Sequence, residues 1–156
     1  MNNNNPQVLV VLGSKSDEET MAGCLALLDK FGIPYEYEIG SAHRNPEKTR
    51  DLAKSARAKG FKVIIAAAGM AAALPGVIAA HTTLPVIGVP IPGSALNGVD
   101  SLYSIVQMPA GTPVATMAIG GHGAKNSALL AVRILSLYDE HIVEKLKRYQ
   151  EELAQR

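Results

Sequence analysis

Short apolar runs alternate with amphipathic stretches along most of this chain. A short continuous apolar run is typical of a strand buried on both faces of a parallel sheet, and Val8–Leu12 is such a run. Similar short apolar runs recur further along the chain, and most of them are followed by an amphipathic stretch. We therefore predict strands over 8–12, 35–39, 63–67, 86–89 and 114–119.

Apolar residues at helical spacing separate most of these strands. Ser16 and Glu19 have the spacing of a capping box, which predicts a first helix that continues to Gly32. Asn45 and Pro46 suit the N-cap and the first position of a second helix, which we expect to end near residue 60. Further helices are predicted over 75–81, 124–138 and 139–156.

The order of strands and helices indicates the fold. Parallel strands joined by helices predict an α/β fold, a three-layer sandwich whose simplest form has a flavodoxin-like parallel sheet. The chain has 156 residues, of which 47% are hydrophobic, so we expect one domain over 1–156. Residues 1–6 are expected to form a disordered tail. The last helix, 139–156, has an apolar stripe that suits packing at a subunit interface, and its residues are Ile142, Leu146, Tyr149 and Leu153.

Composition narrows the classes of function. Fifteen Lys and Arg residues against fourteen Asp and Glu residues give a net charge of +1 without a basic stripe, so nucleic acid is a poor candidate partner. The single cysteine, Cys24, forms neither a disulfide framework nor a Cys/His metal site and suggests a reducing compartment. The chain begins without the features of an export signal, and its apolar runs are too short to span a membrane. We expect a cytoplasmic protein without membrane contact.

Two polar segments, Gly13–Asp17 and Ser41–Pro46, lie where a predicted strand ends and a helix begins. Open α/β sheets bind their ligands at the carboxyl ends of the strands. The two segments offer hydroxyls, a carboxylate, a guanidinium and an imidazole, which suit a phosphorylated sugar and one proton transfer. His43 and Arg44 are the centre of this set. Taken alone, Ser16–Glu19 is most simply an ordinary helix start. Without other evidence, His43 and Arg44 could equally well be polar residues that are only exposed to solvent.

A third segment, Ala66–Gly76, is almost devoid of polar side chains although it follows the third predicted strand. Small residues let the backbone approach a ligand closely, so the backbone N–H groups of this segment could bind a carboxylate or phosphate. The alternative is tight packing of a helix on the sheet, and composition does not decide between the two. The Gly- and Pro-rich segment Gly88–Gly111 is long for a loop, and we expect it to line a site or a subunit contact.

A family resemblance is carried by five segments: Gly13–Asp17, Ser41–Pro46, Leu74–Gly76, Leu84–Pro90 and Asp100–Pro109. In this order and at these spacings they closely resemble the 5-(carboxyamino)imidazole ribonucleotide mutase family of purine biosynthesis. The resemblance implies a flavodoxin-like homo-octamer. It also implies an isomerase that moves a carboxylate from the exocyclic nitrogen of a ribonucleotide to a ring carbon, with no metal, nucleotide or biotin. A transient contact with the upstream ATP-dependent synthetase is left open.

The resemblance assigns roles to individual residues. The family's catalytic histidine falls on His43, and its substrate-binding residues fall on Ser14, Asp17 and Arg44. A histidine, with a reference pKa of about 6.5, can give a proton to the exocyclic nitrogen and take one from the ring carbon at neutral pH. Arg44 offers a charged fork for a phosphate or carboxylate, and Asp17 can accept from ribose hydroxyls. The other substrate-binding residues that we predict are Ser16, Ser41, Ala42, Gly69, Ala72 and Leu74.

The chain departs from the family at two positions of its apolar segment. Ala73 stands where familiar members have histidine before Leu-Pro-Gly, and Met70 stands where they have glycine. The missing imidazole is either dispensable, or replaced by water or another side chain, or linked to an altered substrate preference. The sequence leaves these three explanations open, and His43 keeps the acid-base role in each of them.

Two other classes of function compete with the mutase. A sister enzyme carboxylates aminoimidazole ribonucleotide directly with CO2 and shares the fold and the histidine. It typically has lysine after that histidine and a different loop in place of Leu74–Gly76, so Arg44 and this loop favour the mutase. A non-catalytic nucleotide- or flavin-binding module is disfavoured, because only 4% of the residues are aromatic and the loops have no aromatic pair to sandwich a flavin.

Overall fold

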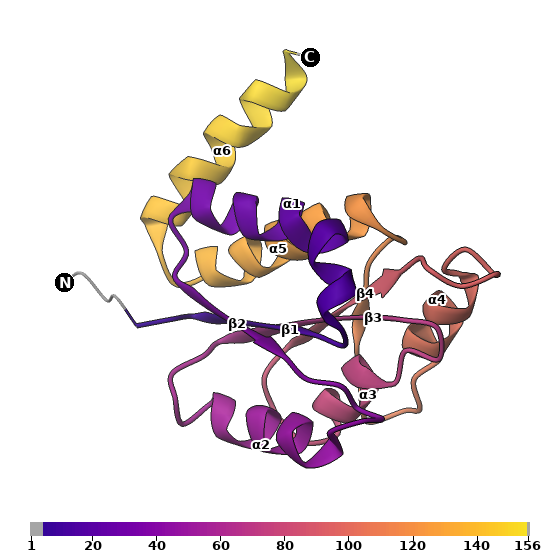
Figure 1. The fold of residues 1–156 in the computed structure, drawn as a ribbon. Helices are drawn as coiled ribbons and strands as arrows, with labels where there is room; N and C mark the ends of the chain where they lie inside the picture. The colour runs from indigo at the N-terminus through magenta and orange to yellow at the C-terminus, as the bar shows by residue number, and fades with distance from the viewer. Residues whose placement is uncertain (1–4, 156) are drawn as a thin grey trace.

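The computed structural model describes residues 5–155, and its centre is one parallel sheet (Figure 1). The strands follow the order β2-β1-β3-β4-β5, and every neighbouring pair is parallel. This confirms the predicted α/β fold with a flavodoxin-like sheet and supplies the strand order that the sequence left open. Residues 1–4 of the predicted tail lie outside the described residues. The strands are β1 (Val8–Leu12), β2 (Tyr35–Ile39), β3 (Val63–Gly69), β4 (Val86–Ile91) and β5 (Ala115–Thr116).

Helices cover both faces of the sheet. In Figure 1, α1 and α5 lie above the sheet and α2 and α3 lie below it. Each layer packs on its own cluster of buried side chains, so the molecule has the predicted three-layer arrangement. The helices are the 3₁₀ turn η1 (Lys15–Asp17), α1 (Glu18–Phe31), α2 (Pro46–Ala56), α3 (Leu74–Ala79), α4 (Val99–Val106), α5 (Gly121–Ser136) and α6 (Glu140–Ala154).

The position of strand β1 inside the sheet explains why its sequence is apolar throughout. Val8, Val10 and Leu12 pack in the cluster that α1 and α5 cover, whereas Leu9 and Val11 point to the opposite cluster. Successive side chains of a strand alternate between faces, and both faces of this central strand are covered. A continuous apolar run is therefore what a strand at the centre of this sandwich needs.

The start of α1 differs from the prediction. The capping box is formed by Ser14 and Asp17 around η1, and not by Ser16 and Glu19. The prediction was wrong because one turn of 3₁₀ helix precedes α1, which moves the cap two residues toward the N-terminus. The predicted end at Gly32 is confirmed, since this residue has φ 68°, the left-handed conformation that glycine adopts easily.

Two other predictions need correction around the β4–β5 connection. Segment 88–111 is not one long loop, because its first residues complete β4 and α4 forms within it. The helix was missed because of the surrounding Gly and Pro residues, but these flank it: Gly98 is its N-cap, with φ 88°. Strand β5 is two residues long where 114–119 was predicted. As the edge strand it pairs only with β4.

Helix α6 projects from the body of the molecule (Figure 1), and side chains from its middle and later part contact the end of α1. The Phe31 and Tyr149 rings meet edge to face with their centroids 5.5 Å apart, and Lys145 Nζ donates to the Phe31 carbonyl at 2.6 Å. Lys30 Nζ pairs with Glu152 at 2.6 Å. These five residues form the α1–α6 contact. Of the predicted apolar stripe, Ile142 is buried and Leu146 and Tyr149 pack against the same cluster, so much of the stripe packs on this chain itself. Contact of α6 with another subunit stays a prediction.

None of the helices within residues 5–155 is both long enough and apolar enough to cross a membrane.

Candidate active site

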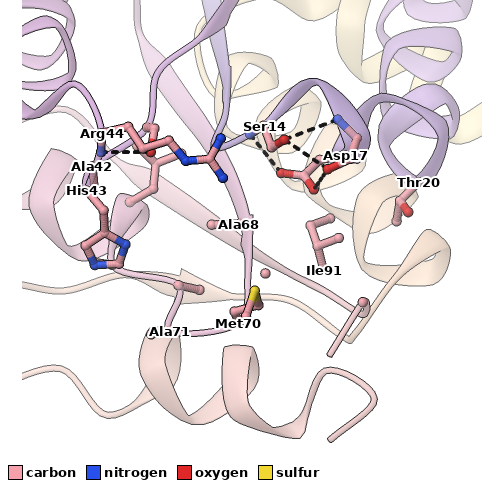
Figure 2. A pocket seen from close by; sticks show the side chains of 18 of the residues that line it. Ser14, Asp17, Thr20, Ala42, His43, Arg44, Ala68, Met70, Ala71 and Ile91 are labelled. Atoms are coloured by element: carbon pink, nitrogen blue, oxygen red, sulfur yellow. Dashed lines mark hydrogen bonds between the residues drawn. The ribbon is translucent and has the colours of Figure 1, made fainter. Parts of the chain in front are cut away.

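A pocket with a volume of about 520 Å³ opens at the carboxyl edge of the sheet, beside the loops that follow β1, β2, β3 and β4 (Figure 2). All ten residues predicted from the sequence line it: His43, Ser14, Ser16, Asp17, Ser41, Ala42, Arg44, Gly69, Ala72 and Leu74. Nine further residues line the pocket, and Thr20 alone among them lies outside the segments that the sequence indicated: Gly13, Thr20, Ala68, Met70, Ala71, Ala73, Ile91, Pro92 and Gly93. The last three belong to the Gly- and Pro-rich segment that was expected to line a site.

The loop after β1 is held by hydrogen bonds among its own side chains. Ser14 Oγ accepts from the Ser16 N–H at 3.3 Å and from the Ser16 hydroxyl at 2.9 Å. Asp17 Oδ2 accepts from the Ser14 N–H at 3.1 Å. The Gly13 N–H donates to the Ala67 carbonyl at 2.9 Å and ties the loop to the end of β3. The two hydroxyls and the carboxylate are therefore fixed at one side of the pocket.

Asp17 is the acidic group of the pocket. It is 7% exposed, and this burial raises the pKa of its carboxyl above the usual range. The hydrogen bonds from Ser14 and Ser16 act in the opposite direction but do not cancel the effect. A buried carboxylate in this position is ready to accept hydrogen bonds from ligand hydroxyls, because few waters compete for it.

The loop after β2 is shaped by the start of α2. Asn45 Oδ1 accepts from the Lys48 N–H at 3.1 Å, and Pro46 is the first residue of the helix, as the sequence predicted. Ser41 Oγ accepts from the Arg44 N–H at 3.2 Å and closes the turn before it. This local network holds the backbone of His43 and Arg44 at the pocket edge.

The His43 and Arg44 side chains are exposed and have no hydrogen-bond partner within residues 5–155. In Figure 2 the Arg44 guanidinium reaches toward Ser14, and the His43 ring lies apart from it, on the side toward Ala71. Both groups are available to a ligand, because the fold uses neither of them.

Residues 68–74, at the end of β3, form a wall of the pocket without any polar side chain, which we call the apolar wall. Ala72 and Leu74 are also buried in the core, so this segment both packs on the sheet and faces the pocket, and anion binding by its backbone N–H groups stays a prediction. A side chain at Gly69 would meet the Ile91 carbonyl at 3.1 Å, which explains the small residue there. Met70 is exceptional on this wall, with φ 55° and a side chain that is 64% exposed.

The titratable groups of the pocket are thus one carboxyl, one imidazole and one guanidinium, from Asp17, His43 and Arg44. Within residues 5–155 no three His, Cys, Asp or Glu side chains gather as metal ligands would. Such a set can bind an anion and a sugar, and its imidazole can carry a proton in either direction at neutral pH.

Comparisons with known proteins agree with this site. The AIR carboxylase family model matches residues 7–156. A protein from Saccharolobus solfataricus named N5-carboxyaminoimidazole ribonucleotide mutase is 55% identical over 148 residues, which cover 95% of this chain and 92% of the relative. A protein of the same name from Bacillus subtilis is 54% identical over 150 residues, or 96% of this chain and 93% of the relative.

Solved structures give the same result. The crystal structure of Treponema denticola PurE superposes with a TM-score of 0.85 at 36% sequence identity, covering 96% of this chain and 92% of that one. The resemblance inferred from the five sequence segments is therefore confirmed over nearly the whole length. This chain belongs to the AIR carboxylase family.

Proposed function

We propose that this chain is an N5-carboxyaminoimidazole ribonucleotide mutase, an isomerase that forms 4-carboxy-5-aminoimidazole ribonucleotide for purine biosynthesis. The names of relatives more than 50% identical to it support this function. The observation that carries the proposal is the pocket itself, in which the unpartnered imidazole of His43 and guanidinium of Arg44 share one loop and border the apolar wall.

The polar side of the pocket is proposed to bind the ribonucleotide. Arg44 is suited to the phosphate or the carboxylate, because its guanidinium presents a planar fork of donors. The Asp17 carboxylate accepts from the ribose hydroxyls. Ser14 and Ser16 add hydroxyl and backbone donors around the phosphate, and Ser41 and Ala42, which line the pocket just before His43, are proposed to contact the substrate as well.

The proposed reaction needs one group that first gives a proton and then takes one. His43 protonates the exocyclic nitrogen as the bond from that nitrogen to the carboxylate carbon breaks, which releases CO2 and leaves aminoimidazole ribonucleotide in the pocket. The ring carbon then attacks CO2 and forms the new carbon–carbon bond. His43 takes the proton that the ring carbon sheds, so the enzyme returns to its starting state and the reaction is an isomerisation.

The apolar wall has a part in this scheme. Between the two bond changes CO2 is free, and it must stay beside the ring carbon. Gly69, Ala72 and Leu74 line this side of the pocket with backbone and hydrocarbon, which offers water no side-chain partner. Exclusion of water also protects the electron-rich ring carbon from protonation by solvent.

The proposal includes a homo-octamer. Large apolar side chains are exposed on and before α4, where they suit contact with another copy of the chain: Leu96, Val99, Tyr103 and Val106. In the same helix, Asp100 Oδ1 is buried without a hydrogen-bond partner among the described residues. Light scattering should therefore give a mass near eight chains, and a monomer at micromolar concentration would contradict this part of the proposal.

A cytoplasmic location is part of the same proposal, supported by the single buried thiol of Cys24. The proposal also includes a transient contact with the ATP-dependent synthetase that supplies the labile substrate. Cross-linking of the two purified enzymes during turnover would test that contact.

A two-arm assay tests the function. One arm supplies the carboxyamino isomer without bicarbonate, and the other supplies aminoimidazole ribonucleotide with bicarbonate. We expect rapid product formation in the first arm only, undiminished by a metal chelator. Faster turnover in the second arm would identify the direct carboxylase, and loss of activity with chelator would contradict a metal-free reaction.

A further inference from the structure

Met70 has an unusual backbone conformation. In the described part of the chain, Met70 and Asn97 are the residues other than glycine with positive φ, at 55° and 51°. Asparagine adopts this left-handed conformation comparatively often, because its short polar side chain can hydrogen-bond locally, but methionine does so rarely. Such strain persists only where the surroundings impose it, and it concentrates at functional sites. The conformation of Met70 therefore suggests a role at the pocket that Met70 lines.

The side chain of Met70 is equally unusual. It is 64% exposed, although methionine is commonly buried. The other long apolar side chains of the pocket, Leu74 and Ile91, are 2% and 4% exposed, so the core already holds them in place. Met70 is thus the long apolar side chain of this wall that the core does not enclose.

The position of Met70 suits a cover. In Figure 2 it lies across the pocket from Arg44 and Ser14, next to the alanines of the apolar wall. A ribonucleotide held by the polar side of the pocket would therefore lie between those groups and Met70. Methionine has several rotatable bonds and a polarisable sulfur, so it adapts to the surface of a planar base.

We propose that Met70 is a positioning residue that folds over the bound ribonucleotide and holds CO2 beside the ring carbon. This rests on the proposed function, because CO2 is free only in that reaction. Met70 takes part in neither bond change: His43 gives and takes the proton, and the carboxylate carbon moves from nitrogen to carbon. Its effect is on the fate of CO2, which either adds to the ring or escapes into solvent.

The test measures how turnover divides between two outcomes. At saturating carboxyamino substrate, the carboxylated product and free aminoimidazole ribonucleotide are quantified, and spontaneous decay is subtracted with an enzyme-free control. We expect Met70→Gly to release about fourfold more free aminoimidazole ribonucleotide per product formed, the scale of one buried methylene group. Met70→Leu should restore most of the retention, because it keeps an apolar side chain of similar size.

Asn97→Gly is the matched control. It relieves the same backbone conformation at a position that does not line the pocket, so its division of products should equal that of the wild type. A Met70→Gly enzyme that divides products as the wild type does would overturn the proposal. Should Met70→Gly fail to fold, Met70→Ala answers the same question. A wild type that does not convert the carboxyamino isomer at all would overturn the proposed function first, and this inference with it.

Discussion

The His43–Arg44 part of the pocket and the α1–α6 contact use polar side chains in opposite ways. At the α1–α6 contact the polar groups are engaged: Lys145 bonds the last carbonyl of α1, and Lys30 pairs with Glu152. In the pocket, the His43 and Arg44 side chains have no partner among residues 5–155. The fold therefore depends on the first group and does not use the second. Substitutions in the two regions should change different measured quantities, and the following predictions test that separation.

The largest expected effect is that of His43→Asn. Asparagine can hydrogen-bond but cannot carry a proton, so kcat should fall by about 10²-fold or more, the usual scale of general acid-base catalysis. The thermal midpoint should stay unchanged, because His43 is exposed and unpartnered. Steady-state kinetics and thermal unfolding of the same preparation check both statements. A variant with near-normal kcat and a lowered midpoint would mean that His43 belongs to the scaffold.

Arg44→Lys should mainly weaken substrate binding. A lysine keeps the charge but cannot reproduce the planar fork of the guanidinium, so we expect a loss of roughly 1–3 kcal/mol, seen as a higher KM. The thermal midpoint should again be unaffected. An unchanged KM would remove Arg44 from the binding role.

Tyr149→Ala should give the reverse pattern at the α1–α6 contact. It removes the ring that packs on Phe31 and that lies 4.9 Å from Lys30 Nζ. We expect the free energy of unfolding to fall by about 1–2 kcal/mol, with kcat per folded site unchanged. Tyr149→Phe is the matched control, because it keeps the ring. A loss of kcat in the alanine variant without a loss of stability would break the separation between the two regions.

The smallest effect concerns Asp17, where stability and substrate binding make opposite demands on the carboxyl group. Burial raises the pKa of its carboxyl in the folded protein, so the ionised form is better accommodated in the unfolded chain. The resulting destabilisation develops as pH rises through the unfolded pKa and is complete above the folded pKa. Asp17→Asn should therefore be more stable than the wild type at neutral pH, and the difference should vanish in acid below the usual aspartate range.

Substrate affinity should fall in the same Asp17→Asn variant, since a neutral amide is a weaker acceptor for the ribose hydroxyls. Unfolding curves at several pH values, together with KM, check the two effects. A stability difference that persists unchanged in acid would contradict the role assigned to burial.

The sequence allowed most of the fold to be predicted, and the local physics explains why. Val8–Leu12 is apolar on both faces because both are covered, and Gly32 ends α1 because it adopts a positive φ. Helix α4 escaped prediction, because its flanking Gly and Pro residues hide a short helix that is held by burial of Ile105 in the core. Such tertiary contacts leave no periodic signal in eight residues.

Most of the pocket was predictable, because its residues either carry functional groups or belong to segments that resemble the family motifs. Ser14, Asp17, His43 and Arg44 carry functional groups in loops, and the family motifs identify them. Thr20 lines the same pocket from α1 without any local signal. For Ile91 the sequence indicated only that its segment lines a site, because it is the sheet order that brings β4 beside the end of β3. The positive φ of Met70 likewise depends on three-dimensional surroundings that the amino-acid sequence does not display.

The most direct test of the account follows the proton that His43 is proposed to carry. When the reaction is run in reverse in D₂O, from the ring-carboxylated nucleotide, the ring carbon loses its carboxylate and must receive one deuteron. Mass spectrometry of the aminoimidazole released on quenching measures its incorporation, against an enzyme-free control. With the wild type we expect deuterium incorporation at the rate of turnover. With His43→Asn we expect incorporation to be slower by about 10²-fold or more. Incorporation at the wild-type rate in that variant would contradict the assignment of His43 as the proton carrier.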